Sequence, residues 1–422
     1  MRILWFCNVP ISKNDLSGTG TWLNAMAHGL MESGNIELGV ISEAKVSHII
    51  KEDCNAIHQW LIPESYSVDK TGLPPSIVLK SINNICEEFA PDLIHVWGTE
   101  GNWGLLTARK ILNYPVLLEI QGLKMTIVDV FYGGLSFWER LNCIGLKEIL
   151  KRRIMKDERR DFYRWGIKEK EIIMGHSFIE FQSPWVASQV RAINPNARLF
   201  KTERVLREEF AVEDSWKLHR QPIIFTSAAY PSSFKGLHVA IRAFRLLQKR
   251  IPNARLRIAG PHQRKGIRQE GYIKWLNSLI KEFGLADNID WLGNLSAIQI
   301  IKELKSAKVV LIPSFVESYC VAMAEAMRIG TPVVASFIGG TSYLGKDEET
   351  CLFFPPGDFN MCAYQLERVI CEDEVACFLS AQSFSVAKQR HDSQKLISQQ
   401  IDTYNIIFDC ADTNINNSKE VL

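Results

Sequence analysis

Residues 223–336 alternate short apolar runs with stretches in which apolar residues recur at helical spacing. The runs IIFTSA, ARLRIAG, KVVLIPS and PVVAS have the length and composition of buried strands, and GLHVAIRAFRLLQKR, IKWLNSLIKEFG and VAMAEAMRIG read as helices between them. Strands joined through helices return to the same edge and run in parallel. The pattern therefore predicts a parallel sheet with helices on both faces.

The first half of the chain repeats this alternation. Apolar runs at residues 3–9, 92–98 and 115–122 are expected to be strands, with helices between them. The full length of 422 residues is about twice that of a typical domain. The predicted fold class is α/β, with two doubly wound, Rossmann-like parallel-sheet domains facing across a cleft. Ligands of such sheets bind at the carboxyl ends of the strands.

The polar stretch at residues 206–222 lacks sustained periodicity and marks the predicted link between the domains. We therefore assign residues 1–205 to the first domain and 206–384 to the second. A helix is expected at 385–410, with its helical pattern running from 385 to 408. We expect it to pack back toward the first domain. Residues 411–422 are polar, and a frayed, flexible tail is expected there.

Composition excludes several classes of protein. The formal net charge is only +2 and charged residues make up 23%, which leaves no basic footprint for nucleic acid. No apolar run reaches the ~18 residues of a transmembrane helix, and the N-terminus lacks the features of a secretory signal. We expect a cytoplasmic protein, either free or at the inner face of the cell membrane.

Metal binding is also not indicated by the sequence. The ten cysteines contain no CxxC pair and no histidines at ligand spacing, and no D-x-D motif follows a strand. Reduced, mostly buried thiols are the expectation. We predict no metal and no cofactor.

The stretch at residues 134–175 is long, helix-favouring and rich in basic residues. Because acidic residues alternate with the basic ones, a solvated helical face that covers the core is the favoured interpretation. The alternative is peripheral contact with a membrane surface.

Two glutamates flank a predicted helix start in the segment VVLIPSFVESYCVAMAEAMRIG. Glu317 lies in the loop after a buried strand, and Glu325 lies in the second turn of a helix that begins near Cys320. A helix start offers unpaired N–H groups and a positive dipole potential, which suit a diphosphate. One carboxylate is then placed to hold ribose hydroxyls while the other faces a sugar. Taken alone, two such carboxylates are more typical of surface residues beside an ordinary helix.

The spacing of the two glutamates resembles the E-x7-E signature of retaining family 4 glycosyltransferases, which have the GT-B fold, and TPVVASFIGGTSYL resembles that family's strand and glycine turn. The resemblance implies a nucleoside diphosphate sugar as co-substrate, with Glu317 on the donor sugar and Glu325 on the ribose. The other implied donor-binding residues are Gly236, Ser318, Tyr319, Cys320, Val321, Gly260, Gly339 and Gly340. Cys320 replaces a common glycine of the family, which narrows the approach to the phosphates.

The segment FTSAAYPSSFKGLHVAIRAF resembles the same family's loop in which a K-G pair opens a helix. The resemblance implies that Lys235 neutralises the leaving diphosphate, which is commonly a large catalytic contribution. Many members carry an arginine six positions earlier, where this chain has Ala229. Arg264 or Arg268, after the strand that ends at Gly260, is the candidate replacement for that charge.

Acceptor-side residues are expected on the loops of the first domain. Gly18 and Gly20 allow close backbone approach to a ligand, and the alternative of a dinucleotide fingerprint is weak because the glycines lie far from the strand and the third one is missing. His95, Trp97 and Glu100 follow one another at the end of a strand, where aromatic faces beside a carboxylate suit a sugar. A histidine in such a strand is more often a satisfied core residue.

Gln121 stands where the resemblance commonly places a histidine of an H-G pair. An amide cannot carry a proton at neutral pH, although it donates and accepts hydrogen bonds. Since the leaving phosphate is usually described as the base in this family, a positioning role for Gln121 is compatible with transfer.

The leading hypothesis is retaining sugar transfer from a nucleoside diphosphate sugar to a hydroxyl of a glycan or lipid-linked glycan, in bacterial surface polysaccharide synthesis. AINPNARLFKTERVLREEF also resembles a segment of bacterial polysaccharide-assembly members of the family. The alternatives are a catalytically silent nucleotide-sugar-binding scaffold, suggested by Ala229 and Gln121, and another GT-B reaction such as epimerisation.

Overall fold

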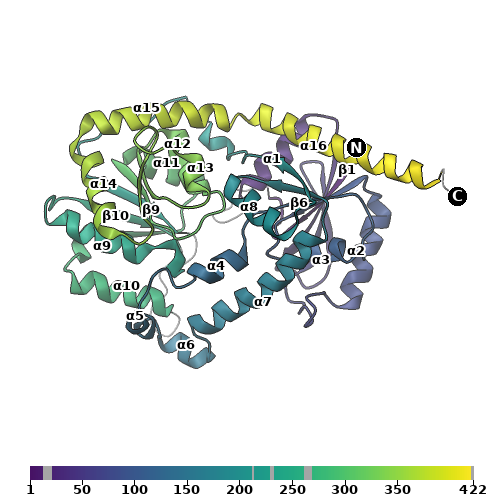
Figure 1. The fold of residues 1–422 in the computed structure, drawn as a ribbon, viewed down its shortest axis with the longest axis horizontal. Coiled ribbons are helices and arrows are strands. Elements are labelled where there is room, and N and C mark those ends of the chain that lie inside the picture. The colour runs from purple at the N-terminus through teal and green to yellow at the C-terminus, as the bar shows by residue number, and fades with distance from the viewer. Residues whose placement is uncertain (13–20, 212, 229–231, 261–268, 420–422) are drawn as a thin grey trace.

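The computed structural model of the chain describes residues 1–12, 21–211, 213–228, 232–260 and 269–419. Two sheets organise these residues, with eight and six strands (Figure 1). Segment 202–222 connects the last strand of the first sheet to the first strand of the second. The predicted α/β class with two parallel-rich sheets is confirmed, whereas the domain boundaries stay a prediction.

The first sheet has the strand order β3-β4-β2-β1-β5-β6-β7-β8 and is parallel except for the β3–β4 pair. Its strands are β1 (Arg2–Cys7), β2 (Glu37–Ala44), β3 (Ile50–Cys54), β4 (Ile57–Pro63), β5 (Leu93–Trp97), β6 (Val116–Glu119), β7 (Phe178–Phe181) and β8 (Arg198–Lys201). The helices around it are α1 (Thr21–Glu32), α2 (Ser76–Phe89), α3 (Trp103–Ala108), α4 (Lys124–Val130), α7 (Met155–Met174) and α8 (Pro184–Ile193). Strands β1 and β5 are buried along almost their whole length, as expected for central strands covered on both faces.

The second sheet is parallel throughout, with the order β11-β10-β9-β12-β13-β14. Its strands are β9 (Ile223–Ser227), β10 (Arg255–Ala259), β11 (Ile289–Gly293), β12 (Val309–Ile312), β13 (Val333–Ser336) and β14 (Leu352–Phe354). Its helices are η2 (Ser233–Lys235), α9 (Leu237–Gln248), α10 (Gly271–Glu282), α11 (Ala297–Ser306), α12 (Val321–Ile329), α13 (Thr341–Leu344) and α14 (Phe359–Cys371). Apolar residues of α9 and α10 pack on one side of this sheet, and those of α12 pack on the other.

The charged stretch forms three helices, α5 (Phe137–Asn142), α6 (Leu146–Lys151) and α7. In Figure 1 they run along the lower edge of the molecule. Helix α7 packs against α3 and α4, while α5 and α6 contact α10 of the second half. The stretch therefore reaches across from the first sheet to the helices of the second.

The expectation of a single helix over residues 385–408 is wrong, because one helix ends at Arg390 and another begins at Ser393. Helix α15 (Asp373–Arg390) packs on α12, and α16 (Ser393–Lys419) crosses back to pack on α1. The helix is interrupted at His391, whose Nδ1 contacts the backbone oxygen of Arg204 at 2.9 Å. Helix α16 also continues to Lys419, beyond the start of the expected tail.

None of the helices in the described part of the chain combines the length and the apolar character that crossing a bilayer requires.

Candidate active site

The loop that follows β12 places Glu317 beside Lys235. The Lys235 Nζ donates to Glu317 Oε1 at 2.7 Å, and the Ser314 hydroxyl donates to the same oxygen at 2.7 Å. Burial lowers and the Glu317 carboxylate raises the pKa of Lys235, and the net shift is upward. Lys235 is therefore held as a cation at the carboxyl end of the second sheet, where β9 and β12 are neighbours.

Gly236 explains how Lys235 reaches this position. Its φ is +74°, and a Cβ there would lie 1.9 Å from the backbone oxygen of Pro313. Only glycine accepts both the left-handed conformation and the close approach. The glycine of the K-G pair thus seats η2 directly against the end of β12.

Helix α12 begins directly after Cys320, close to the start expected from the sequence. Cys320 is its N-cap residue with a φ of +82°, and no side chain caps the helix start. The first-turn amides of α12 are thus not taken up by a capping side chain, and the dipole potential there favours an anion. Burial raises the pKa of the Cys320 thiol, so the thiol stays neutral and adds no charge.

Gly339 and Gly340 pack against the loop that carries Glu317. The Gly340 N–H donates to the backbone oxygen of Glu317 at 2.7 Å. A Cβ on Gly339 would lie 2.4 Å from that same oxygen, and one on Gly340 would lie 2.5 Å from the Tyr319 Cα. The glycine turn therefore packs directly on the loop that carries Glu317 and fixes the position of that loop.

Gly260 makes a similar close approach one strand away, since a Cβ there would lie 2.3 Å from the Ala228 oxygen. The structure thus brings Gly236, Gly260, Gly339 and Gly340 to the same sheet edge.

Glu325 is buried in α12 and is engaged by an arginine that the sequence analysis missed. Arg207 donates to Glu325 Oε1 through Nη2 at 2.8 Å and through Nε at 3.1 Å. Arg207 belongs to the linking segment, where no periodic pattern marks a residue as buried. The ribose role expected for Glu325 stays a prediction.

Residues 313–320, between β12 and α12, are called the donor-side loop from here on. Ser318 connects this loop to the first half of the molecule. Its hydroxyl donates to the backbone oxygen of Gln121, and its own backbone oxygen accepts from the Ser183 hydroxyl at 2.8 Å. The predicted catalytic Gln121 and the predicted donor residue Ser318 are therefore in direct contact. Val321, at the first position of α12, packs against buried apolar residues of both the first and the second half of the molecule.

Tyr319 points away from this edge and into the linking segment. Its hydroxyl donates to Glu203 at 2.8 Å, and the Tyr343 hydroxyl donates to the same carboxylate. The Tyr319 side chain is buried, so these contacts hold the loop. The donor-binding role expected for Tyr319 stays a prediction.

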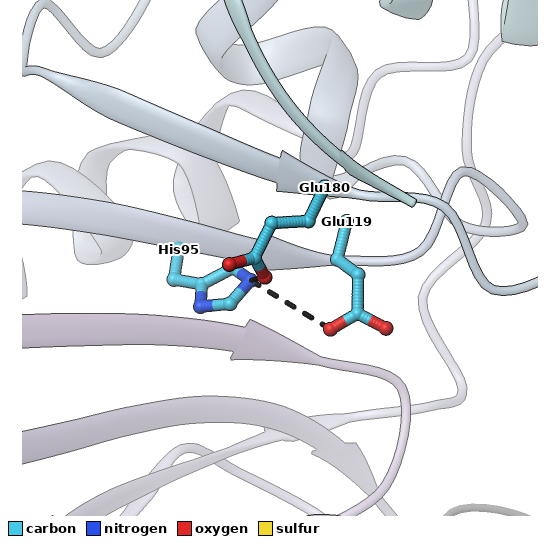
Figure 2. A group of neighbouring side chains, drawn as sticks. All are labelled: His95, Glu119 and Glu180. Atoms are coloured by element: carbon cyan, nitrogen blue, oxygen red, sulfur yellow. Dashed lines mark ion pairs between the residues drawn. The ribbon is translucent and has the colours of Figure 1, made fainter. Parts of the chain in front are cut away.

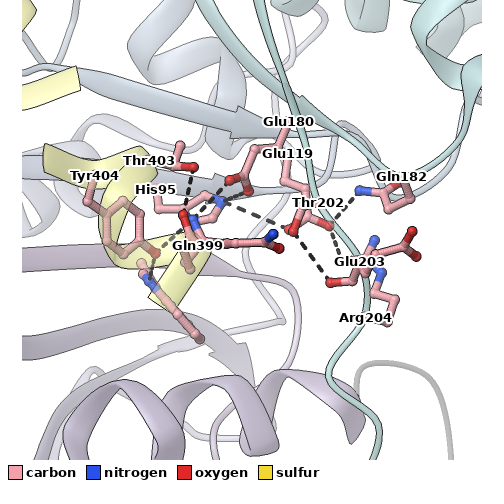
Figure 3. A network of polar contacts seen from close by, with 12 residues as sticks. His95, Glu119, Glu180, Gln182, Thr202, Glu203, Arg204, Gln399, Thr403 and Tyr404 are labelled. Atoms are coloured by element: carbon pink, nitrogen blue, oxygen red, sulfur yellow. Dashed lines mark hydrogen bonds and ion pairs between the residues drawn. The ribbon is translucent and has the colours of Figure 1, made fainter. Parts of the chain in front are cut away.

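His95 and Trp97 lie in the core, which corrects the expectation that they face an acceptor. Both side chains are fully buried and their rings stack at 4.0 Å. His95 Nδ1 meets the Tyr404 hydroxyl of α16 at 2.8 Å (Figure 3). Burial lowers the pKa of His95 well below its ordinary value, so the ring is neutral. Helix α16, contributed from more than 300 residues away, covers this strand end.

His95, Glu119 and Glu180 form the group in the described part of the chain whose ligand atoms are close enough to share a metal ion, within 4.8 Å of one another (Figure 2). Arg204 instead supplies a cation, because its guanidinium pairs with Glu119 (Figure 3). Burial and the Glu119 carboxylate raise the pKa of Glu180 well above its usual range. Burial also raises the pKa of Glu119 to about 7, although the Arg204 guanidinium lowers it, so both carboxyl groups beside His95 bind protons more readily than exposed ones.

Glu100 lies beside Gln121 and not in this buried group. A Cβ on Gly98 would lie 2.2 Å from a Glu100 carboxyl oxygen and 3.3 Å from the Gln121 Cδ, so the two side chains flank the same turn. Burial raises the pKa of Glu100 to about 7. Among the expected acceptor-side residues that the structure describes, Glu100 is the one that lies beside Gln121.

Gly18 and Gly20 lie outside the described residues, as do Ala229 and the candidate replacement arginines Arg264 and Arg268.

Comparison with known proteins identifies the second half. Residues 209–380 match the family model of the glycosyl transferases group 1. A D-inositol 3-phosphate glycosyltransferase of Saccharomonospora viridis is 31% identical over 162 residues, which are 37% of each chain. The putative colanic acid biosynthesis glycosyltransferase WcaL of Escherichia coli is 31% identical over 153 residues, 34% of this chain and 35% of that protein. The chain thus matches little more than a third of these relatives' length.

Solved structures extend the similarity of fold to nearly the whole chain. A sucrose-phosphate synthase from Thermosynechococcus elongatus gives a TM-score of 0.73 at 17% identity, covering 97% of this chain and 99% of that one. Anabaena Alr3699/HepE in complex with UDP-glucose gives 0.67 at 15% identity, covering 96% and 99%. The expected family and fold are confirmed: residues 209–380 are a domain of the glycosyl transferases group 1 family, within a chain of the GT-B fold.

Proposed function

We propose that this protein transfers a sugar, with retention of anomeric configuration, from a nucleoside diphosphate sugar to a hydroxyl of a glycan or lipid-linked glycan. The observation that carries the proposal is the 2.7 Å contact between Lys235 Nζ and Glu317 Oε1, next to the uncapped start of α12. A cation and a helix N-terminus together suit the diphosphate, and the carboxylate suits the donor sugar.

The relatives support the same substrate class and guide the choice of donor. Anabaena Alr3699/HepE is similar in fold and has been solved with UDP-glucose, which makes UDP-sugars the first donors to test. The name of WcaL refers to colanic acid biosynthesis, which is consistent with synthesis of a surface polysaccharide. Gln121 holds the donor-side loop through its backbone oxygen, and its side chain fits a positioning role that needs no proton transfer.

The test is donor turnover by the Lys235→Ala and Glu317→Ala variants. Each change removes one partner of the central ion pair, and loss of preorganised electrostatic stabilisation lowers kcat by about 100-fold or more. Lys388→Ala is the matched control, because Lys388 forms an exposed ion pair with Glu213 at 2.9 Å and should transfer sugar like the wild type.

Wild-type turnover in both active-site variants would contradict the proposal. Binding of a nucleoside diphosphate without transfer to any acceptor would favour the silent scaffold. Conversion of the donor without an acceptor would favour an epimerase.

A further inference from the structure

Helices α5 and α6 expose large apolar side chains at an unusual density. Of the seventeen large hydrophobic residues exposed in the described part of the chain, six lie within residues 137–150. They are between 41 and 73% exposed: Phe137, Trp138, Leu141, Leu146, Ile149 and Leu150. We call these six residues, with the adjoining cations Lys151, Arg152 and Lys156, the α5–α6 face. Soluble surfaces rarely gather apolar groups in this way without a partner.

The polar sides of the same helices are turned inward. Glu139 of α5 pairs with Arg242 of α9, and Lys147 of α6 pairs with Glu270 at 2.7 Å. Glu148 accepts from the Gly271 N–H at the start of α10 at 3.0 Å. Each helix therefore uses its charged side chains to bind the second half of the molecule and leaves its apolar side chains outside. This is the reverse of a helix that covers a core.

The cations next to these apolar side chains are available to a partner. Lys151, Arg152 and Lys156 are exposed, and among the described residues none of them forms an ion pair with an acidic side chain. The neighbouring Arg153 and Arg160 differ, because they pair with Asp161 and Asp157. The excess positive charge is thus concentrated at the junction of α6 and α7.

We propose that the α5–α6 face docks on the surface of an anionic lipid bilayer. Tryptophan, phenylalanine and leucine side chains insert at the boundary between headgroups and acyl chains, and lysines and arginines beside them bind lipid phosphates. The combination of an outward apolar stripe with unpaired cations fits this partner better than an apolar protein surface, which offers the cations no counter-charge. The alternation of acidic and basic residues in the sequence favours a solvated face here, and the exposed apolar side chains change that interpretation.

The face connects to the candidate active site through the segment before α5. The Ser233 hydroxyl of η2 donates to the Phe131 oxygen at 2.6 Å, and His238 Nε2 contacts the Gly133 oxygen at 2.9 Å. Since η2 also carries Lys235, docking of α5 and α6 would hold the donor side of the molecule close to the membrane. Such a location suits a lipid-linked acceptor. The docking itself does not depend on sugar transfer.

The test is co-flotation of the full chain with vesicles of phosphatidylcholine alone and of phosphatidylcholine with phosphatidylglycerol. We expect binding only to the anionic vesicles, with release as salt screens the attraction. The apolar variant Trp138→Ser/Leu150→Ser and the charge variant Lys151→Glu/Arg152→Glu should each partition more than about tenfold less, because the first removes two inserted apolar groups and the second reverses two charges that face the lipid phosphates.

The matched control is Ile77→Ser/Ile298→Ser, because these residues of α2 and α11 are 74 and 71% exposed and lie outside the face. It should bind like the wild type, and all variants should keep the wild-type melting temperature. Equal flotation of the apolar variant and the wild type would overturn the proposal. So would a wild-type dimer that the apolar variant converts to a monomer, without binding to either kind of vesicle. Loss of flotation with wild-type turnover of a soluble acceptor separates docking from catalysis.

Discussion

At the scale of single residues, the candidate site depends on glycines, because any side chain at these positions would lower the stability of the fold. Gly236 and Gly34 have nearly the same φ, +74° and +70°. Their surroundings differ, because a Cβ on Gly236 would lie 1.9 Å from the Pro313 oxygen, whereas one on Gly34 meets nothing within 4 Å. The pair thus separates the cost of backbone conformation from the cost of a steric clash.

We expect Gly34→Ala to lower the free energy of unfolding by about 1 kcal/mol, the cost of a left-handed alanine. Gly236→Ala should cost more than about 2 kcal/mol, because the chain around Pro313 must also move. Urea denaturation of both variants gives the comparison. Equal destabilisation by the two changes would show that the close approach to Pro313 is relieved without cost.

At the scale of elements, helix α16 owes its position to polar contacts inside the first half. Trp5 Nε1 donates to the Tyr404 hydroxyl at 3.1 Å, and Gln400 Nε2 donates to Glu180 at 3.0 Å. These contacts bury a carboxyl group whose pKa is raised above the ordinary value of 4.5 by burial and by Glu119. The anchorage of α16 is therefore coupled to a proton.

The sign of this coupling follows from the upward shift. A raised pKa in the folded state contributes stability that is fully present below the unfolded value and is lost as the pH rises toward the folded value. Above about pH 4.5 the contribution of Glu180 to the free energy of unfolding therefore falls, by up to about 1.4 kcal/mol per pH unit. Glu180→Gln cannot ionise and still accepts from Gln400. We expect this variant to be more stable than the wild type at pH 8 and to show a flatter pH profile.

Denaturation at pH 5, 6.5 and 8 measures this difference. Glu32→Gln, at an exposed position of α1, is the control and should keep the wild-type slope. A Glu180→Gln variant whose stability falls with pH as steeply as that of the wild type would assign the slope to other groups.

The same elements show how far the sequence could predict the structure. Apolar runs such as those of β1 and β12 are local signals, and so are the helix start at Cys320 and the Glu317 loop, which the structure places as expected. His95 and Trp97 were misjudged because their partners are distant in sequence: Tyr404 of α16 contacts His95, and Trp5 and Trp22 pack against Trp97. The break at His391 and the roles of Arg204 and Arg207 likewise depend on tertiary contacts that leave no periodic trace in the sequence.

At the scale of the whole molecule, side chains of the linking segment reach in opposite directions and contact both halves. Arg204 reaches into the first half, where it pairs with Glu119 and lies over the Trp22 ring at 3.7 Å. Glu203 and Arg207 reach into the second half, where they contact Tyr319 and Glu325. Because Tyr319 and Glu325 flank the start of α12, the position of the donor-side loop depends on how this segment is anchored.

Arg204→Met tests that dependence. The change removes the cation from the buried Glu119 carboxyl, whose pKa is about 7 even beside Arg204. At pH 8 the carboxyl must either stay charged or take up a proton, which costs up to about 3–5 kcal/mol, while much of the apolar contact with Trp22 is kept. Glu119→Gln in the same chain removes the ionisable group, so the double variant should regain more than half of the lost free energy of unfolding at this pH. Denaturant titrations of the wild type, both single variants and the double variant complete the cycle. Strictly additive losses would mean that the pair does not anchor the link, whereas recovery of stability without recovery of sugar transfer would indicate that Arg204 also sets the position of the donor-side loop.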